Sequence, residues 1–301
     1  MAALKQIRQR IRSIQSTKQI MRAMQLVSGS KFKRSQSRLL QSRQMMGFLD
    51  DLLQRVLAAT KAGGKRAKAA GRLEHPLMAA REGKPGALLV VTSDAGLAGS
   101  YNTNLITLAH AELDRYTARR TETSYVGKRG ARHFMKRGYP AQDAILDLAG
   151  RPDIARIDAI GKALMDRFVS GKIGSVRVLY AKFISPTVSK PTVVQWLPIR
   201  LQTSPSPEPR ATSQGAVEYI FEPSPERVFA DLLPRWAISA FRLLLLEAFT
   251  SEHGARMIAM KNATDNAQEL LTSLTLRRNK LRQATITREL SEIVGTVEAL
   301  K

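Results

Sequence analysis

The fold is decided by residues 235–301, which read RWAISAFRLLLLEAFTSEHGARMIAMKNATDNAQELLTSLTLRRNKLRQATITRELSEIVGTVEALK. This stretch contains no proline and only two glycines, Gly254 and Gly295. At a rise of about 1.5 Å per residue, one helix over these positions would be roughly 100 Å long, several times the length of an average globular helix. Such a helix requires a partner that covers its apolar side.

Apolar residues recur along this stretch at steps of three and four. They are Leu270, Leu274 and Leu281, followed by Ile286, Leu290, Ile293, Val297 and Leu300. The spacing predicts a seam that packs against another helix. Ser224, Pro225 and Glu226 are typical of a helix start, and Pro234 predicts a kink or a second start.

The expected partner is the other end of the chain. No proline occurs between Met1 and His75, and apolar side chains from Leu4 to Val56 fall on helical spacing. A helix from Ala2 to about Leu57 would span on the order of 80 Å. The arginine-rich residues 2–18 also fit a mitochondrial presequence. Because the periodic pattern continues without a break past Met21, we favour a mature helix that forms an antiparallel coiled coil with the C-terminal one.

Composition limits the classes of protein that the chain can belong to. Its 301 residues are 44% apolar, enough for a sizeable core, and they contain no cysteine. The formal charge of +23 is concentrated at the N-terminus, where residues 1–72 hold 17 Lys and Arg against Asp50 and Asp51. The basic end should therefore meet an acidic partner. Disulfides and thiol chemistry are excluded, and no apolar run reaches the length of a membrane span.

The middle of the chain changes period and predicts an α/β domain. Strands are expected over residues 87–92, 124–126, 176–184 and 192–197, and helices over residues 101–119, 132–136 and 153–169. Alternation of strands and helices is typical of a Rossmann-like arrangement. We divide the chain into an N-terminal coiled-coil helix at 1–60, a basic connector at 61–75, the α/β domain at 76–201, a linker at 202–223 and a C-terminal coiled-coil helix at 224–301.

The glycine turn after the first expected strand is the best candidate for a ligand site. Asp94, Gly96 and Gly99 lie between a strand and a helix, where α/β sheets often bind ligands. The turn lacks the Gly-x-Gly-x-x-Gly spacing, and the chain contains no Walker A loop. We expect a structural turn or a partner contact here rather than nucleotide chemistry.

The remaining polar residues give no catalytic pattern. The four histidines, His75, His110, His133 and His253, have no metal-ligand spacing. We therefore expect no catalytic residue, cofactor or metal. The basic run from Lys31 to Arg43 fits a nucleic-acid contact, an acidic protein loop or a solvated face, and composition alone leaves these three alternatives open.

Both ends of the chain resemble the gamma subunit of the F-type ATP synthase. The N-terminal stretch IRQRIRSIQSTKQIMRAMQLVSGSKFKRSQ resembles the opening helix of that family, and the stretch from Ser251 to Val294 is similar to its C-terminal signature almost residue for residue. The turn SDAGLAGSYNTNL resembles the family's Asp-Arg-Gly-Leu-x-Gly turn, with Ala95 where arginine is usual.

The resemblance implies a non-catalytic rotor shaft that couples ion-driven rotation of a membrane ring to conformational changes at catalytic subunits. The implied partners are the alpha and beta subunits as a hexamer, the epsilon subunit and the ring of c subunits, with one copy of this chain per complex. Association with the membrane is then indirect, and nucleic acid is not a partner. A bacterial protein would lie on the cytoplasmic side of the inner membrane, and a mitochondrial one on the matrix side.

The resemblance also implies residues that contact the beta subunits. Arg256 and Gln283 are expected to meet a loop of a beta subunit, and Arg282, Thr287 and Glu289 belong to the same expected polar cluster. Met24 on the opposing helix matches a methionine of the family near this region. The alternatives that remain open are a salt-dependent nucleic-acid-binding coiled coil and a nucleotide-dependent α/β enzyme.

Overall fold

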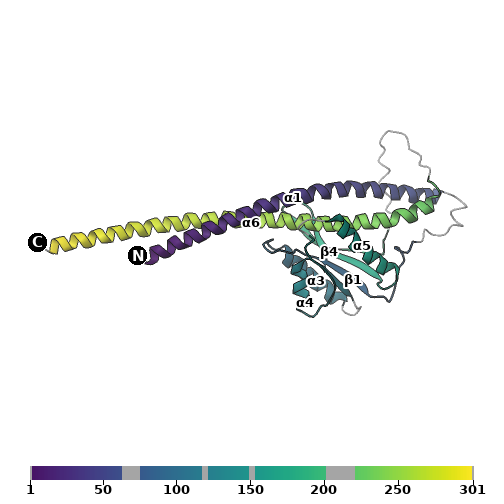
Figure 1. Ribbon diagram of the computed structural model, residues 1–301, viewed down its shortest axis with the longest axis horizontal. Coiled ribbons are helices and arrows are strands. Elements are labelled where there is room, and N and C mark those ends of the chain that lie inside the picture. The colour runs from purple at the N-terminus through teal and green to yellow at the C-terminus, as the bar shows by residue number, and fades with distance from the viewer. Residues whose placement is uncertain (1, 63–74, 117–120, 149–152, 201–220, 300–301) are drawn as a thin grey trace, which may run out of the picture. The chain divides into compact units, whose positions relative to one another are not determined.

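The computed structural model describes residues 2–62, 75–116, 121–148, 153–200 and 221–299. Two helices dominate it: α1 (Ala2–Ala62) and α6 (Pro225–Ala299), of 61 and 75 residues (Figure 1). Both expected terminal helices are therefore present. Nearly all of the expected linker at 202–223 lies outside the described residues, as does nearly all of the expected connector at 61–75.

A five-stranded sheet lies between the two long helices in sequence. Its strands are β1 (Gly86–Val91), β2 (Glu122–Val126), β3 (Ala141–Ile145), β4 (Ser175–Phe183) and β5 (Ser189–Leu197). They follow the order β3-β2-β1-β4-β5 across the sheet. All neighbouring pairs are parallel except β4 and β5, which are antiparallel.

Three shorter helices connect the parallel strands: α3 (Tyr101–Tyr116), α4 (Lys128–Met135) and α5 (Ile154–Val169). The start of α5 follows from its sequence, because the Asp153 carboxylate accepts hydrogen bonds from the backbone N–H groups of Ala155 and Arg156, at 3.0 and 3.4 Å. The Arg242 guanidinium of α6 binds both carboxylate oxygens of Asp158 in α5, at 3.0 and 2.7 Å. This paired contact fixes α5 against α6.

The centre of the sheet is buried on both faces. Leu88 and Val90 of β1 pack with the apolar residues of α3 and α4, whereas Leu89 and Val91 face the core that α5, α1 and α6 complete. Successive side chains of a strand point to opposite faces, so a strand covered on both sides consists of an unbroken apolar run. This explains why β1 reads as ALLVV and was recognisable in the sequence.

The structure adds one strand that was not expected and excludes one of the alternatives for Pro234. The strand β3 was not predicted, and its central residues Gln142, Asp143 and Ala144 are all exposed. Of the two alternatives for Pro234, a kink or a second helix start, the second start is excluded because α6 continues through the proline. The proline has no N–H to donate to the carbonyl of Ala230, one turn earlier. The His75 side chain hydrogen-bonds to that backbone group instead.

The described chain divides into two compact units. One consists of Met1–Ser30 with Arg256–Lys301, and the other consists of Lys31–Ala255. We call them the helical unit and the sheet unit. The helices α1 and α6 contribute to both units. Within the described ranges, no helix is both long enough and apolar enough to span a membrane.

Candidate functional site

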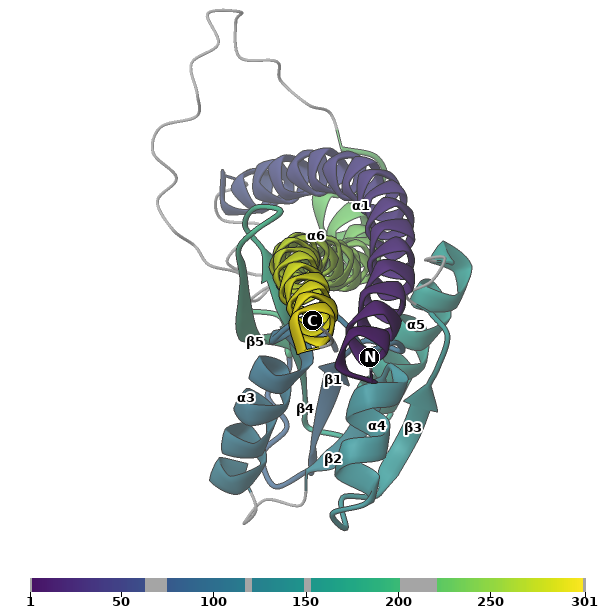
Figure 2. The ribbon, with the colours of Figure 1, turned by 90° about the vertical axis from the view of Figure 1, so that its left-hand side faces the viewer.

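The helical unit is an antiparallel pair formed by the start of α1 and the end of α6. A Cβ atom placed on Gly29 would lie 3.4 Å from the sulfur of Met257, and the Lys18 ammonium donates to the side-chain oxygen of Gln268. The two contacts lie eleven positions apart on each helix, descending along α1 and ascending along α6. The helices are therefore antiparallel and keep a constant register between the two contacts. Figure 2 looks along this pair, with the start of α1 next to α6, and Figure 1 shows the same two helices running alongside each other.

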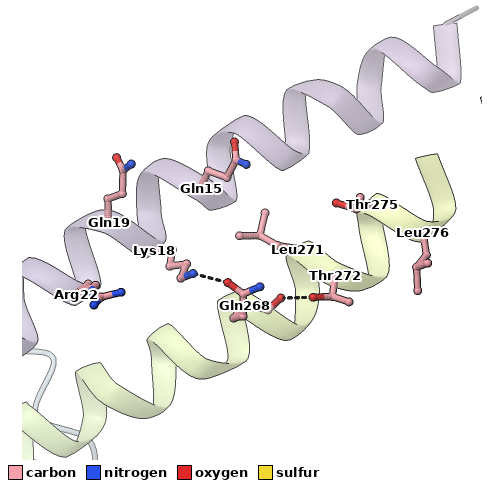
Figure 3. Close-up of a pocket in the computed structure, with 9 residues that line it drawn as sticks. All are labelled: Gln15, Lys18, Gln19, Arg22, Gln268, Leu271, Thr272, Thr275 and Leu276. Atoms are coloured by element: carbon pink, nitrogen blue, oxygen red, sulfur yellow. Dashed lines mark hydrogen bonds between the residues drawn. The ribbon is translucent and has the colours of Figure 1, made fainter. Parts of the chain in front are cut away.

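A groove lined by both polar and apolar side chains opens between the two helices of this pair (Figure 3). It has a volume of about 710 Å³, and Lys18 and Arg22 of α1 supply its positive charge. The facing side of α6 contributes Leu271 and two threonines, Thr272 and Thr275. The Thr272 hydroxyl donates to the carbonyl of Gln268 in its own helix at 3.1 Å. The groove can therefore receive an acidic or polar group beside an apolar floor.

The last turns of α6 extend past the start of α1. At the spacing of the two contacts above, Ala2 lies level with about residue 284 of α6, and Figure 1 shows α6 continuing beyond α1. Four apolar side chains of this end are therefore exposed: Ile286, Leu290, Ile293 and Val294. The expectation that α1 covers the seam from Ile286 to Ile293 was wrong. The first residue of α1, Ala2, lies level with about residue 284, so the seam lies beyond this helix.

The upstream part of the seam also differs in register from the expected one. Leu270 is exposed, and Leu271 is the buried residue. Leu274 and Leu281 are partly buried, as a seam beside α1 requires. The sequence contains two adjacent leucines here, and only the position of α1 decides which of them is covered.

The structure separates the six residues expected to contact a partner. Arg282, Gln283, Thr287 and Glu289 are exposed and lie within about two turns of one another near the end of α6. Arg256 is only 7% exposed and precedes Gln283 by 27 positions, which corresponds to about 40 Å along the helix. Met24 is partly buried on α1 and, by the helix register, is closer to the level of Arg256 than to that of Gln283.

The helical unit has a strongly positive surface along α1. Between residues 2 and 30 this helix carries six basic residues and no acidic one: Lys5, Arg8, Arg10, Arg12, Lys18 and Arg22. Five of these side chains are exposed, and Lys18 is partly buried in the groove. Nearby charges of one sign raise the local concentration of an oppositely charged partner. The pattern favours a partner with acidic side chains.

The glycine turn of the sheet unit is held by its own side chains. One carboxylate oxygen of Asp94 accepts hydrogen bonds from the backbone N–H groups of Lys128 and Asp147, both at 3.1 Å. Asp94 therefore supplies an anion at the N-terminus of α4, where a ligand phosphate would otherwise bind. The guanidinium of Arg129 lies against Gly96, and Gly99 has a positive φ of 58°. These contacts support the structural interpretation of the turn.

Leu97 in the same turn was not singled out from the sequence. It is a leucine in the left-handed region, with φ 61°, and its side chain is 60% exposed. Both features are unfavourable for an isolated turn, since the left-handed conformation is rare for leucine and an exposed leucine gains nothing from burial. A partner contact at this turn stays a prediction.

Two histidines that are distant in sequence meet on the surface of the sheet unit. The Nε2 atoms of His110 on α3 and His133 on α4 lie 2.9 Å apart, and Arg137 lies 3.1 Å from Nδ1 of His133. Burial, followed by the positive charge of Arg137, lowers the pKa of His133. No group of three or more metal-ligating side chains occurs in the part of the chain that the structure describes.

Sequence reasoning did not identify the polar run Thr250-Ser251-Glu252-His253, which is buried inside the sheet unit. All ten residues from Leu245 to Gly254 of α6 are buried. A helix with no exposed side over almost three turns is enclosed all round. The signal in the sequence was a block of polar residues within an otherwise apolar helix, and its enclosure becomes apparent only from the tertiary structure.

Comparison with known proteins places the chain in a family. A family model described as ATP synthase matches residues 3–300. The ATP synthase gamma chain of Symbiobacterium thermophilum is 39% identical over 99% of this chain and 98% of the relative. The ATP synthase gamma chain of Anaeromyxobacter dehalogenans is 38% identical over the whole of both chains.

Solved structures support the fold. A chain of the central stalk and c-ring structure of the Tetrahymena thermophila mitochondrial ATP synthase superposes with a TM-score of 0.55 at 20% identity, covering 81% of this chain and 99% of that one. A chain of the Euglena gracilis mitochondrial ATP synthase gives a TM-score of 0.51 at 17% identity, covering 90% and 95%. The pair of long helices enclosing a sheet domain in sequence is therefore shared with solved proteins.

Proposed function

Because the chain belongs to the ATP synthase gamma-chain family, we propose that it is the central rotor shaft of an F-type ATP synthase. In this role it couples ion-driven rotation of the membrane c-ring to conformational changes at the catalytic beta subunits. The reverse direction, in which ATP hydrolysis turns the shaft, uses the same contacts. The chain itself supplies no catalytic group in this proposal.

The observation that carries the proposal is the uncovered end of α6. α6 extends past the start of its partner α1, and its apolar side chains there are exposed. They are Ile286, Leu290, Ile293 and Val294. Exposed apolar patches of this kind mark protein–protein contact sites. The flanking residues Arg282, Gln283 and Thr287 are also exposed. An enclosing set of partner subunits would cover both the apolar and the polar residues of this end.

The mechanism follows from the lack of threefold symmetry in a pair of helices. Two helices of different sequence present different side chains to each of three identical subunits around them. A contact shifts the conformational equilibrium of a subunit only by the difference in its free energy between the two states. To move a site from 1:99 to 99:1 requires roughly 5.5 kcal/mol. Rotation of the shaft would move these contacts from one subunit to the next.

The charge of the helical unit fits this arrangement. The exposed basic residues of α1 and the groove lined by Lys18 and Arg22 favour acidic loops on the surrounding subunits. Exposed ion pairs are weak, with a median of about 0–1 kcal/mol each. Such contacts can form and break at each step of rotation, whereas strong buried pairs would hold the shaft at one angle.

The remaining partners are proposed because the chain belongs to this family, and each is assigned to one of the two units. The alpha and beta subunits would surround the helical unit, and the epsilon subunit and c-ring would contact the sheet unit. One shaft per complex is expected, because a second copy could not occupy the same axis. Association with the membrane would be indirect, on the cytoplasmic face of the inner membrane in a bacterium.

Reconstitution with purified alpha and beta subunits tests this function. We expect one copy of this chain per three alpha and beta pairs, and ATP turnover that depends on its presence. Gln283→Ala should lower turnover by up to roughly tenfold, as expected for the loss of one hydrogen bond. Gln44→Ala is the matched control, since Gln44 is an exposed glutamine of α1 in the sheet unit. A chain that fails to join assembled alpha and beta subunits would rule out the rotor role.

A further inference from the structure

One segment of α6, residues 245–254, is enclosed on every side within the sheet unit. We call it the enclosed segment. It contains five polar or charged residues, Glu247, Thr250, Ser251, Glu252 and His253, none of which is more than 6% exposed. Burial of polar side chains costs free energy unless they form hydrogen bonds. These five side chains therefore need hydrogen-bond partners in the elements around the enclosed segment.

Two hydrogen bonds join the enclosed segment to α1. The hydroxyls of Ser35 and Thr250 lie 2.8 Å apart, and Thr250 donates its own proton to the carbonyl of Leu246 at 2.7 Å. Ser35 is therefore the donor and Thr250 the acceptor between the helices. Arg43 of α1 donates to the Glu247 carboxylate at 2.6 Å and also to the carbonyl of Phe183 at 3.2 Å.

Three more hydrogen bonds join the segment to the sheet and to α3. The Ser251 hydroxyl donates to the carbonyl of Ala181 in β4 at 3.0 Å. The Tyr101 hydroxyl of α3 donates to the carbonyl of Ala248 at 3.1 Å. Burial, with a smaller effect of Glu247, raises the pKa of Tyr180 in β4 above its ordinary range. Its phenol therefore stays protonated and hydrogen-bonds to the Glu247 side chain.

Gly254 allows a close approach at the end of the segment. A Cβ atom at this position would lie 3.0 Å from the carbonyl oxygen of Pro186 and 3.4 Å from the ring of Phe32. The loop after β4 and the helix α1 therefore both rest against the backbone of α6. Together with the hydrogen bonds, this close packing surrounds α6 with α1, α3, β4 and the loop.

Apolar packing and hydrogen bonds resist different motions of an enclosed helix. The hydrophobic effect is non-directional and depends on the buried area. A helix that turns or slides within an apolar sleeve keeps much of that area. Hydrogen bonds depend steeply on distance and angle. A shift of α6 by one residue rotates it by about 100°, which would break these five hydrogen bonds of the enclosed segment at once.

We propose that the hydrogen bonds of five side chains lock the rotational and axial register of α6 within the sheet unit. Torque can then pass between the sheet and α6 without slip. The five residues are Ser35, Arg43, Tyr101, Tyr180 and Ser251. This inference rests on the proposed rotor function. The five side chains are positioning residues that hold the shaft and touch no substrate. Replacement of buried polar pairs by well-packed apolar residues is often neutral or stabilising, so stability alone does not require these hydrogen bonds.

Rotation under two loads tests the register lock. The triple variant Ser35→Ala, Thr250→Val, Ser251→Ala removes three buried hydroxyls, and each net hydrogen bond lost should favour a slipped register by roughly fivefold. Reconstituted complexes would carry a probe on Gln142→Cys, an exposed position in β3. The control is Thr264→Val, because Thr264 is a buried threonine whose hydroxyl donates to Met260 of its own helix at 2.8 Å.

We expect the triple variant to rotate a small probe like the wild-type chain and to lose rotation with a large bead while ATP hydrolysis continues. The control variant should rotate both probes. Equal rotation of the large bead by the triple variant and the wild type would overturn the lock. If the wild-type chain itself does not rotate, the rotor function fails instead. Should the triple variant not assemble, Ser251→Ala gives the same comparison with a smaller slip.

A covalent bond between the two helices gives a second, independent test. The chain has no cysteine, so Ser35→Cys with Thr250→Cys introduces a unique pair. A static lock predicts that the oxidised variant keeps the ATP turnover of its reduced form in the reconstituted complex. Loss of turnover on oxidation, reversed by reduction, would show that α6 must move within the enclosed segment and would contradict the proposal.

Discussion

The side chain of His75 is hydrogen-bonded to the backbone of Ala230, whose carbonyl lies one turn before Pro234 in α6. Nδ1 of His75 accepts a hydrogen bond from the N–H of Leu77 at 3.1 Å, so Nε2 is the nitrogen that donates to the Ala230 carbonyl. Pro234 leaves this carbonyl without its helical donor. A residue before the sheet therefore replaces the missing hydrogen bond and lets α6 continue as one helix.

The stability of the chain should fall on acidification because of His75. Burial, opposed by the hydrogen bond to Ala230, lowers the pKa of His75 below its ordinary value of 6.5. The folded state then binds this proton less readily than the unfolded state does, so its contribution to stability is present above pH 6.5 and is lost as the pH falls through the lowered pKa. Urea unfolding of the full chain between pH 7.5 and 5.5 measures this loss.

The variant His75→Gln separates His75 from the other titrating groups. A glutamine amide can still donate to the Ala230 carbonyl but does not titrate. We expect a smaller loss of stability between pH 7.5 and 5.5 in this variant than in the wild type. An identical pH dependence of the two proteins would show that His75 does not titrate in this range.

Two glycines in helices of the sheet unit should respond to alanine in opposite directions. A Cβ atom on Gly161 of α5 would lie 2.9 Å from the buried ring of Phe241 and 3.1 Å from Ile238, both in α6. Gly161→Ala should therefore destabilise the chain by about 1–3 kcal/mol. Gly47 of α1 is exposed, and a Cβ atom at this position would have nothing within 4 Å. Gly47→Ala should stabilise by about 0.5–1 kcal/mol, as measured by urea unfolding.

Removal of Arg43 should destabilise the sheet unit. Its guanidinium binds Glu247, whose side chain is only 7% exposed. Loss of one partner of a fully buried pair costs about 3–5 kcal/mol. Because Arg43 is itself 39% exposed, we expect a smaller effect, about 2 kcal/mol, after discounting for solvent. Arg10→Ala, an exposed arginine of α1, should change the unfolding free energy by less than about 0.5 kcal/mol.

A substitution in the exposed end of α6 should lower the affinity of the chain for the alpha and beta subunits. It should leave the unfolding free energy of the isolated chain nearly unchanged. Ile293 is 60% exposed, so Ile293→Glu should leave the unfolding free energy of the chain within about 0.5 kcal/mol of the wild type. In the reconstituted complex the charge would be placed in an apolar contact, and the affinity should fall by roughly tenfold or more. Equal affinity of both proteins for alpha and beta subunits would show that this end stays in solvent.

Much of the fold could be predicted from the sequence where the pattern was long or unbroken. The proline-free ends gave α1 and α6, and the apolar run of β1 identified the centre of the sheet. The strand β3 could not be predicted, because AQDAI has no apolar alternation and becomes a strand only by pairing with β2. Edge strands depend on their neighbours more than on their own residues.

The residues of the candidate site could be predicted from the sequence, but their burial and their contacts with one another could not. The expected contacts Arg282, Gln283, Thr287 and Glu289 are exposed together, and their role as partner contacts stays a prediction. Arg256 is only 7% exposed, and helical spacing alone could not predict its burial. The lock residues Ser35 and Thr250 lie 215 positions apart in the chain, so only the structure reveals their contact.

Direct observation of rotation tests the rotor function most directly. A complex of alpha and beta subunits would be fixed to a surface, with a probe attached to this chain through Gln142→Cys. The proposed function predicts that ATP drives rotation of the probe in one direction, with pauses that follow the threefold symmetry of the surrounding subunits. A bound chain that stays at a fixed angle while the same complexes hydrolyse ATP would contradict it.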